Sequence, residues 1–515
     1  MSNVIVHEVP KNPDPNGSDA PTGVVASFRY AFTSLTRLRI EVLGGLVVAL
    51  ALIPEAISFS ILAEVDPRVG LFSAVTMAVT IAFTGGRPAM ISAATGAVAL
   101  VVAPLSKEYG LDYLIAAVLL GGVFQIIMAL LGVAKLMRFI PRSVMTGFVN
   151  ALAITIFVAQ LPHLIDVPWL VYPLLGVSLI ILYGFPRIST TIPAPLVTIL
   201  VMTVVVVLFG WNVPDVGQQG ELPDSLPTLM IPEVPLNLET LQIIAPYALS
   251  VALVGLLESL MTAKLVDDIS EVHSDKTRES WGQGVANIVT GVFGGMGGCA
   301  MIGQTLINVQ IARARTRLST LLAGVFLLLA VVGLGDIVGL IPMAALVAIM
   351  IMVSLTTLDW HSIQPRTLKV MPLSETIVML VTVVATLFTG NLAIGVVLGV
   401  ITAMIMFARR VSHVVTVEKL PAPGEADEPV AVRTYQVRGQ LFWASSNDLV
   451  YQFDYRDNAG KILIDLTQAE VWDASTVATL DAIIQKFADK GKEVEIIGLD
   501  GSSQARLDRL SGKLG

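Results

Sequence analysis

Two glutamates stand inside long apolar stretches, where a charged side chain is rare. Glu55 lies in ALIPEAISFS and Glu258 lies in VGLLESLMTA. Placing a charge at the centre of a bilayer costs about 2.5–3.5 kcal/mol on insertion scales, so an acid at that depth has a specific role. Two hypotheses are open for each carboxyl. It is either a protonated, hydrogen-bonded structural group, or a group that binds and releases a proton during a functional cycle.

A stretch rich in small residues follows each glutamate. It reads PAMISAATGAVAL after the first and GGCAMIGQTLIN after the second. From Glu55 to Thr95 is 40 residues, and from Glu258 to Ala300 is 42 residues. The chain therefore repeats one combination, an embedded acid followed by a small-residue segment, at matching places.

These small-residue segments are too short to be ordinary membrane spans. A helix needs about 20 residues to cross about 30 Å of hydrocarbon, and the apolar segments cover only 90–104 and 300–311. They are either places of close helix packing, which small residues permit, or helices that begin halfway through the membrane. In the second case we expect helices that start near Ala94 and Ala300, the latter reached through the glycine-rich segment 294–299.

A helix that begins inside the membrane has a distinctive chemistry. Its first N–H groups have no partner within the helix, and its macrodipole places about half a positive charge at that end. Two such ends facing each other would form an anion site that needs no Lys or Arg.

The composition divides the chain into a membrane part and a soluble part. Of 515 residues, 54% are hydrophobic and only 14% are charged, whereas a soluble protein is about 25% charged. The charged residues are concentrated after Arg410. We predict a disordered tail at 1–24, a membrane domain at 25–410 with repeats near 40–210 and 240–410, a linker at 411–430 and a soluble domain at 431–515. The single cysteine, Cys299, excludes an internal disulfide and any site built from several cysteines.

Fourteen apolar segments are expected in the membrane domain. They lie near 41–63, 70–84, 90–104, 111–131, 143–161, 169–185, 194–209, 243–265, 279–293, 300–311, 319–334, 337–354, 373–389 and 393–408. Lys and Arg accumulate in cytoplasmic loops. If the N-terminus lies on the cytoplasmic side, Arg68 and Lys107 are the only Lys or Arg residues of the loops that fall on the outer side. We therefore expect a protein of the plasma (inner) membrane with both termini and the soluble domain in the cytoplasm.

The fold class expected is an all-α polytopic membrane protein with 14 transmembrane segments in a 7+7 inverted repeat, plus a small cytoplasmic α/β domain. Because seven is odd, the second set of seven enters the membrane in the opposite orientation. Inverted repeats with broken helices at the midplane are common in secondary transporters.

The segments IPEAISFS, LLESLMTA and GGCAMIGQTLIN and the soluble tail together resemble the SulP, or solute carrier family 26, anion transporters. The resemblance extends over residues 25–515. It implies a core (segments 1–4 and 8–11) and a gate (segments 5–7 and 12–14), anion transport by an elevator-like movement of one against the other, and commonly a homodimer. Members of the family carry sulfate, bicarbonate, chloride, oxalate or C4-dicarboxylates.

The resemblance also implies which residues bind the substrate and the coupling ion. The substrate-binding residues are Glu55, Ser58, Phe59, Ala94, Thr95, Gly96, Ala97, Ala300, Met301 and Ile302, and the coupling-ion residues are Glu258 and Thr262. Many members have Gln at the position of Glu55, so this chain has an extra acid there. Sodium-coupled members place small and hydroxyl residues where Ala300 and Ile302 stand, and Ile302 offers no side-chain oxygen. A proton is therefore favoured over sodium as the coupling ion.

We thus expect a secondary active, proton-coupled transporter for a small oxyanion or dicarboxylate that acts in the lipid bilayer without a cofactor, a metal or nucleic acid. A sodium-coupled symporter, an anion channel and a mainly regulatory scaffold are the alternatives. The chain contains no phosphate-binding P-loop. An intramembrane enzyme is disfavoured because no metal ligands or nucleophile–base pair accompany the glutamates.

The soluble tail alternates strand and helix patterns. VRTYQVRGQLFW, KILIDLT and EVEIIGLD are typical of strands, and STVATLDAIIQKFADKG and SSQARLDRLSG are typical of helices. The tail resembles the STAS domain of the same family. Asp473 or Ser475 is expected to cap the first of these helices, and Ser475 is either such a cap or a regulatory phosphorylation site.

Overall fold

The computed structural model describes residues 20–135, 140–188, 193–223, 225–333, 335–412, 415–421 and 431–513. The chain divides into two compact units after Val400. The predicted N-terminal tail lies outside the described residues as far as residue 19, and so does the part of the predicted linker at 422–430. Thr22, at the end of the predicted tail, accepts hydrogen bonds from the guanidinium of Arg317.

The first unit is helical, and its last helix continues past Val400 into the second unit. Its helices are α1 (Val24–Ala31), α2 (Leu35–Leu62), α3 (Pro67–Thr84), α4 (Gly96–Tyr109), α5 (Leu111–Leu130), α6 (Arg142–Gln160), α7 (Val171–Gly184), α8 (Ala194–Phe209), α9 (Leu238–Ser270), α10 (Lys276–Val292), α11 (Ile302–Leu306), α12 (Arg317–Gly333), α13 (Gly335–Gly339), α14 (Met343–Thr357), α15 (Pro365–Val370), α16 (Leu373–Thr389) and α17 (Leu392–Ser412). A π-helical turn, Ile307–Ile311, continues α11. The strands of this unit are β1 (Ser92–Ala93) and β2 (Cys299–Ala300).

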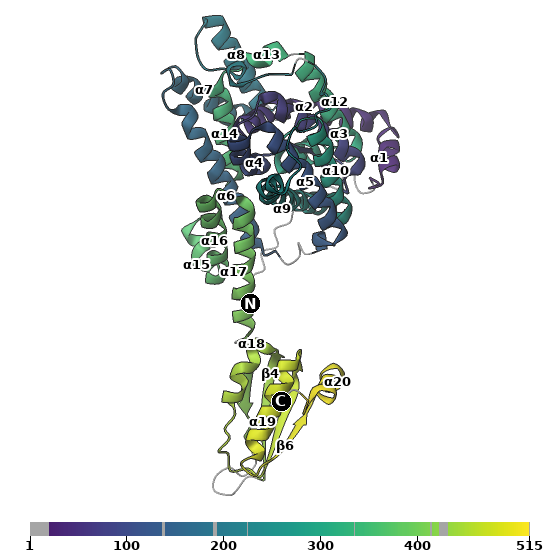
Figure 1. The fold of residues 1–515 in the computed structure, drawn as a ribbon, viewed down its shortest axis with the longest axis vertical. Helices are drawn as coiled ribbons and strands as arrows, with labels where there is room; N and C mark the ends of the chain where they lie inside the picture. The colour runs from purple at the N-terminus through teal and green to yellow at the C-terminus, as the bar shows by residue number, and fades with distance from the viewer. Residues whose placement is uncertain are drawn as a thin grey trace. The chain divides into compact units, whose positions relative to one another are not determined.

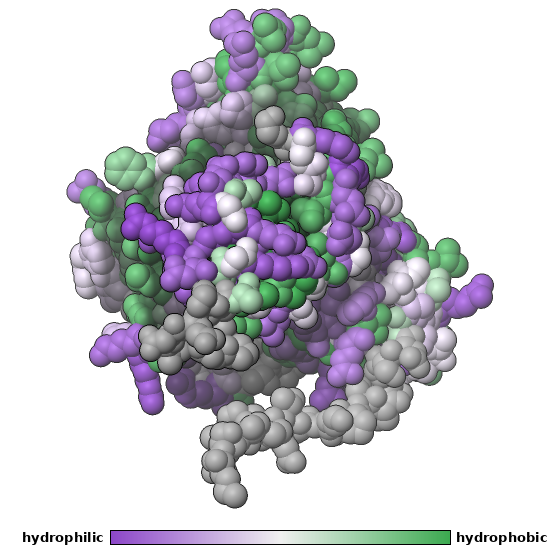
Figure 2. Space-filling view, turned by 90° about the horizontal axis from the view of Figure 1, so that it is seen from below, coloured by the Kyte–Doolittle hydropathy of each residue, from purple (hydrophilic) through white to green (hydrophobic). Residues whose placement is uncertain are grey.

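Six helices of the described chain are long and apolar enough to cross a membrane, namely α2, α3, α5, α6, α9 and α17. Five shorter apolar helices accompany them, namely α7, α8, α12, α14 and α16. Large hydrophobic side chains such as Leu208, Phe209 and Phe388 are exposed, and hydrophobic groups reach the surface beside hydrophilic ones in the space-filling view (Figure 2). Exposed apolar surface of this kind is typical of contact with lipid.

Helices from the two halves of the first unit pack against each other in a reciprocal way, so that a helix of each half contacts two helices of the other. α5 packs on α9 and α10, while α12 packs on α2 and α3 (Figure 1). Where α5 meets α10, a Cβ added to either Gly122 or Gly284 would lie 2.6 Å from the carbonyl oxygen of the other. Glycine is therefore required for this close approach of two helices. Both short helices, α4 and α11, contact α2 and α9, the helices that carry Glu55 and Glu258.

The second unit is a four-stranded sheet with helices. Its strands are β3 (Thr416–Lys419), β4 (Val432–Leu441), β5 (Lys461–Val471) and β6 (Glu493–Ile497), and its helices are α18 (Trp443–Leu449), α19 (Ala474–Ala488) and α20 (Gly501–Leu510). The strand order is β3-β4-β5-β6, with β3 antiparallel to β4 and the other pairs parallel. The strands and helices predicted for the soluble tail are confirmed. β3 was not predicted, and it lies within the segment expected to be linker.

Candidate anion-binding site

The two extended segments that precede α4 and α11 pair with each other. Ser92 lies opposite Ala300 and Ala93 lies opposite Cys299 in an antiparallel two-stranded sheet. Irregular backbone at membrane depth is tolerated only where protein satisfies its polar groups, and this pairing supplies those partners. Because a helix begins within three residues of the end of each strand, the N-terminal ends of α4 and α11 start from the same place in the fold.

The two helices begin later than the sequence predicted. Starts near Ala94 and Ala300 were expected, whereas α4 begins at Gly96 and α11 at Ile302. Ala300 belongs to β2, where pairing with β1 keeps the backbone extended. Before α4, the hydroxyl of Thr95 accepts the Val98 N–H at 3.4 Å and acts as the N-cap.

A glycine is needed where β2 approaches β1. A Cβ on Gly298 would lie 2.7 Å from the carbonyl carbon of Ala93 and nearer still to its oxygen. The side chain of Asn287 fixes this glycine from the other side, because it accepts the Gly298 N–H at 2.9 Å and donates to the Gly298 carbonyl at 3.1 Å. The glycine run therefore has a structural reason in this strand pairing.

A cavity of about 450 Å³ opens beside the starts of the two short helices. On one side it is lined by α2, α4, α9 and the α11 segment, which contribute Glu55, Thr95, Glu258 and Gln304. On the other side it is lined by α6, α14 and the ends of α7 and α8. Among the described residues, that second wall carries only apolar and hydroxyl side chains, such as Phe148.

The structure brings most of the predicted site residues to this cavity. Those that line it are Glu55, Phe59, Thr95, Gly96, Ala97, Glu258, Met301 and Ile302. The remaining four do not line it. Ala94 follows β1 and Ala300 belongs to β2, and both are buried. The hydroxyls of Ser58 and Thr262 donate to the carbonyls of Pro54 and Glu258, each four residues earlier in its own helix, at 2.7 and 2.8 Å.

The carboxyl of Glu258 is connected to the cap of α4 through the single cysteine. The Cys299 thiol donates to Oε2 of Glu258 at 2.9 Å, and its sulfur lies 3.1 Å from the Thr95 hydroxyl. Next to it, the Ser259 hydroxyl accepts the Ala300 N–H at 3.1 Å. α9 is thus joined to β2 by two neighbouring side chains, and to α4 through the thiol. Sequence reasoning assigned no role to Cys299 in the site.

Sequence reasoning also missed residues that line the cavity. The side chain of Gln304 approaches the Glu55 carboxyl, and Met261 lies one position before the predicted Thr262. Gln304 stands within the GGCAMIGQTLIN stretch, so that stretch contained the signal for it. The apolar wall from α6 and α14 has no local pattern that distinguishes it from other membrane helices.

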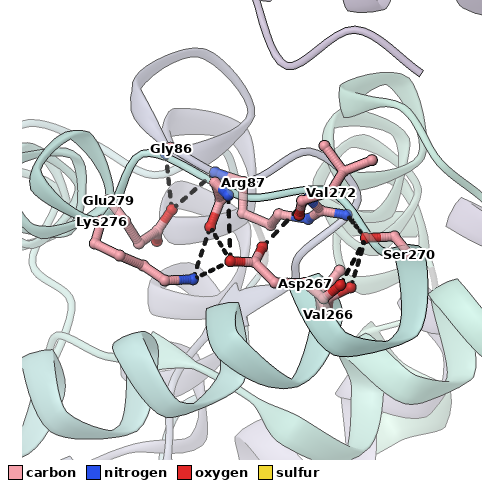
Figure 3. Close-up of polar contacts among 9 residues, drawn as sticks. Gly86, Arg87, Val266, Asp267, Ser270, Val272, Lys276 and Glu279 are labelled. Atoms are coloured by element: carbon pink, nitrogen blue, oxygen red, sulfur yellow. Dashed lines mark hydrogen bonds and ion pairs between the residues drawn. The ribbon is translucent and has the colours of Figure 1, made fainter. Parts of the chain in front are cut away.

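A buried ion-pair network supports the segment that leads into β1. Asp267, near the end of α9, lies between Arg87 and Lys276 (Figure 3), with oxygen–nitrogen distances of 3.3 and 2.6 Å. The carboxylate of Glu279 accepts the backbone N–H groups of Gly86 and Arg87 at 2.8 and 3.2 Å. These contacts tie the start of the first short-helix segment to α9 and α10.

Two of the predicted site positions have no side-chain oxygen that could bind sodium. They are Ala300 and Ile302. Within the described ranges, no group of three or more His, Cys, Asp or Glu side chains is placed to hold a metal ion.

In the second unit, Asp473 and not Ser475 caps α19. Asp473 accepts the Thr476 N–H at 2.9 Å. Of the two caps predicted for this helix, Asp473 is confirmed and Ser475 is wrong, because α19 begins at Ala474 and Ser475 falls inside its first turn. Its side chain is exposed.

Comparison with known proteins agrees with this architecture. Residues 38–174 and 167–382 match the model of the sulfate permease family, and residues 425–511 match the STAS domain. The chain is 49% identical over 474 residues to the Bacillus subtilis protein named "Putative sulfate transporter YbaR", covering 92% of this chain and 97% of that protein. It is 25% identical over 521 residues to the bicarbonate transporter BicA of Picosynechococcus sp., covering 92% and 91%.

A solved structure shares the fold across both units. The murine solute carrier 26 family member A9 anion transporter, in the inward-facing state, aligns with a TM-score of 0.81 at 15% identity, covering 95% of this chain and 90% of that one. The family is one of transporters and not of enzymes. This chain therefore belongs to the sulfate permease family, as an anion transporter with a STAS domain at its C-terminal end.

Proposed function

We propose that this protein is a proton-coupled secondary transporter that moves a small oxyanion or dicarboxylate, of the sulfate, bicarbonate or C4-dicarboxylate class. The observation that carries the proposal is the cavity at the starts of α4 and α11. The first N–H groups of a helix have no partner within the helix, and together with the positive end of the helix dipole they favour an anion there. Glu55 and Glu258 line the same cavity, and their ionised forms repel an anion.

The proposed mechanism follows from this conflict of charge. When Glu258 binds a proton, it no longer repels the anion, so the two bind together and are released together. A ligand can drive such a cycle only through its different affinity for two states. Proton binding supplies that difference without a bound metal, and the lack of oxygen ligands at Ala300 and Ile302 favours a proton over sodium.

The proposed movement is elevator-like. The core would comprise α2–α5 and α9–α12, which hold the glutamates and the short helices. The gate would comprise α6–α8, α14, α16 and α17. The gate residues that the structure describes at the cavity are apolar or carry a hydroxyl. A wall without charges can slide past the site without breaking ion pairs, which supports a movement of core against gate.

The proposed topology is a 7+7 inverted repeat with fourteen spans. The reciprocal packing supports it, because α5 contacts α9 and α10 as α12 contacts α2 and α3. The gate helices pack reciprocally as well. In the proposed repeat α6 and α7 correspond to α14 and α16, and α6 packs on α16 as α14 packs on α7. We further propose a homodimer in the inner membrane with both termini and the STAS domain in the cytoplasm.

Uptake by proteoliposomes tests the proposal. Purified protein is assayed with sulfate, bicarbonate, chloride, fumarate and succinate, with and without an inward proton gradient. We expect concentrative uptake of at least one anion that depends on the proton gradient. Glu258→Gln should retain anion binding and lose the gradient-driven accumulation, while Glu239→Gln, an exposed residue of the same helix, should behave as wild type.

The alternatives give different results in the same assay. Accumulation driven by a sodium gradient would identify a sodium symporter, and conductance without accumulation would identify a channel. Full pH-dependent accumulation by Glu258→Gln would refute the coupling role of this residue.

A further inference from the structure

We propose that Cys299 is a positioning residue that passes the protonation state of Glu258 to the substrate side of α4, through a reversal of the hydrogen bonds that join Glu258, Cys299 and Thr95. This inference rests on the proposed function, because it specifies how proton binding changes the anion site.

The geometry provides a continuous chain of three groups. The Cys299 sulfur lies 2.9 Å from Oε2 of Glu258 and 3.1 Å from the hydroxyl of Thr95. Cys299 is completely buried and Thr95 is nearly so, while both Glu258 and Thr95 line the cavity. The thiol thus connects two cavity-lining side chains from behind, and bulk water has no access to it.

The direction of the hydrogen bonds depends on the charge of Glu258. A carboxylate only accepts hydrogen bonds, so the thiol must donate to it. The sulfur then accepts from the Thr95 O–H, and the Thr95 hydrogen points away from the cavity. In this state the hydroxyl offers only its lone pairs to the Val98 N–H that it caps and to the cavity.

Proton binding reverses the chain. Glu258 takes one proton from solution and becomes a donor to the Cys299 sulfur. The S–H bond rotates toward the Thr95 oxygen, which has two lone pairs and can accept from both the thiol and Val98. The Thr95 O–H rotates into the cavity. Apart from the new O–H bond on Glu258, no covalent bond forms or breaks, and the site gains a hydrogen-bond donor for an anion when the coupling proton is bound.

The other charged groups near α9 do not interrupt this chain. Of the described residues that line the cavity, Glu55 on α2 is the other charged one. β2 contributes Cys299, and α11 contains no charged or titratable residue. The charged and tyrosine side chains on the remaining elements packed against α9 are Lys107, Glu108 and Tyr109 on α4, Asp112 and Tyr113 on α5, and Lys276, Arg278 and Glu279 on α10.

The charged residues of α10 have their own partners. Lys276 pairs with Asp267 and Glu279 accepts from the backbone at Gly86. Arg278 donates to the carbonyls of Phe83 and Thr84 at the end of α3. The residues of α4 and α5 lie at the C-terminal end of one helix and the N-terminal end of the other, away from the capped start of α4.

Infrared spectroscopy can observe the reversal directly, because the chain has one cysteine and its S–H stretching band therefore reports on Cys299 alone. The full-length protein in lipid nanodiscs is titrated between about pH 9 and about pH 5 without any substrate anion. We expect the band to move to higher frequency on acidification, because a hydroxyl is a weaker acceptor than a carboxylate. Glu258→Gln should show no pH-dependent shift, and Cys299→Ala should lack the band, which confirms its assignment.

Anion binding provides a second measurement with sulfate and bicarbonate as probes. A hydrogen bond to a charged group changes affinity by about tenfold or more. We expect the affinity at acid pH divided by the affinity at alkaline pH to fall by about tenfold in Cys299→Ala. Cys299→Ser should restore this ratio, because its hydroxyl can both donate and accept a hydrogen bond. A merely structural cysteine would lower affinity equally at both pH values, and that result would overturn the proposal.

A band that does not move in the wild type, or that moves equally in Glu258→Gln, would also overturn it. The infrared experiment contains no anion, so this failure is separate from a failure of the transport proposal, which the uptake assay decides.

Discussion

Replacing Gly298 by alanine should separate β2 from β1 and disable the anion site. A Cβ at this position would lie 2.7 Å from the Ala93 carbonyl carbon and closer to its oxygen, whereas ordinary contact begins at 3.4 Å. One strand must therefore move by about 0.7 Å or more. The obstacle is backbone, which cannot rotate away as a side chain can.

The consequence can be estimated from the parts that the strand pairing positions. Overpacking of this kind costs about 1–3 kcal/mol when the structure adapts. A displacement of about 1 Å in a positioning element lowers the rate of a dependent step by up to about 100-fold. The displaced strand carries Cys299, so the start of α4 and the contact to Glu258 move with it.

The assay compares anion uptake by proteoliposomes with the thermal unfolding of the purified protein. Gly298→Ala should lower the unfolding temperature modestly and reduce uptake by about tenfold or more. Gly176→Ala is the matched control, because the same change on α7 meets nothing within 4 Å. Wild-type uptake by Gly298→Ala would refute the idea that the close strand pairing positions the site.

Three other changes test separate parts of the structure. Asp267→Asn leaves the buried Arg87 without its anionic partner, which should lower the free energy of unfolding by about 3–5 kcal/mol and lower the unfolding temperature. Asp268→Asn, at the exposed neighbouring residue, should leave the unfolding temperature unchanged. Equal stability of the two variants would contradict the role of the network. Glu55→Gln removes a negative charge from the cavity and should therefore tighten the binding of sulfate or bicarbonate at alkaline pH, which titration calorimetry measures. Weaker binding by this variant would show that the ionised acid does not repel the anion. In the second unit, burial opposes ionisation of Asp457, but hydrogen bonds and two neighbouring cations hold its pKa below the ordinary value. The contribution of Asp457 to stability is therefore complete above about pH 3.9 and is lost as the pH falls below that value. In calorimetry at a series of pH values, acid should destabilise the wild type more than Asp457→Asn. Equal acid sensitivity of the two would contradict this.

Features with a local signal were predictable from the sequence. The apolar segment 194–209 coincides with α8, and the alternating pattern after residue 431 predicted β4, β5, β6, α19 and α20 of the second unit. The short helices were also expected, because their length alone distinguishes them from full spans. In each case hydrophobic periodicity or segment length contains the information.

Features that depend on distant contacts were not predictable. β1 and β2 are two residues each and lie about 200 residues apart in the chain, so no local pattern announces their pairing or the later starts of α4 and α11. β3 was missed because it is an edge strand of only four residues. The bridging position of Cys299 depends on α4, α9 and β2 meeting at one point, which a single cysteine in a sequence does not reveal.

Direct observation of the bound anion tests the central claim. A cryo-electron microscopy map of the full chain in nanodiscs, recorded with the anion that binds most tightly, should show density in the cavity between Thr95 and Met301, at the starts of α4 and α11. Density for that anion elsewhere, with the cavity empty under saturating conditions, would contradict the account.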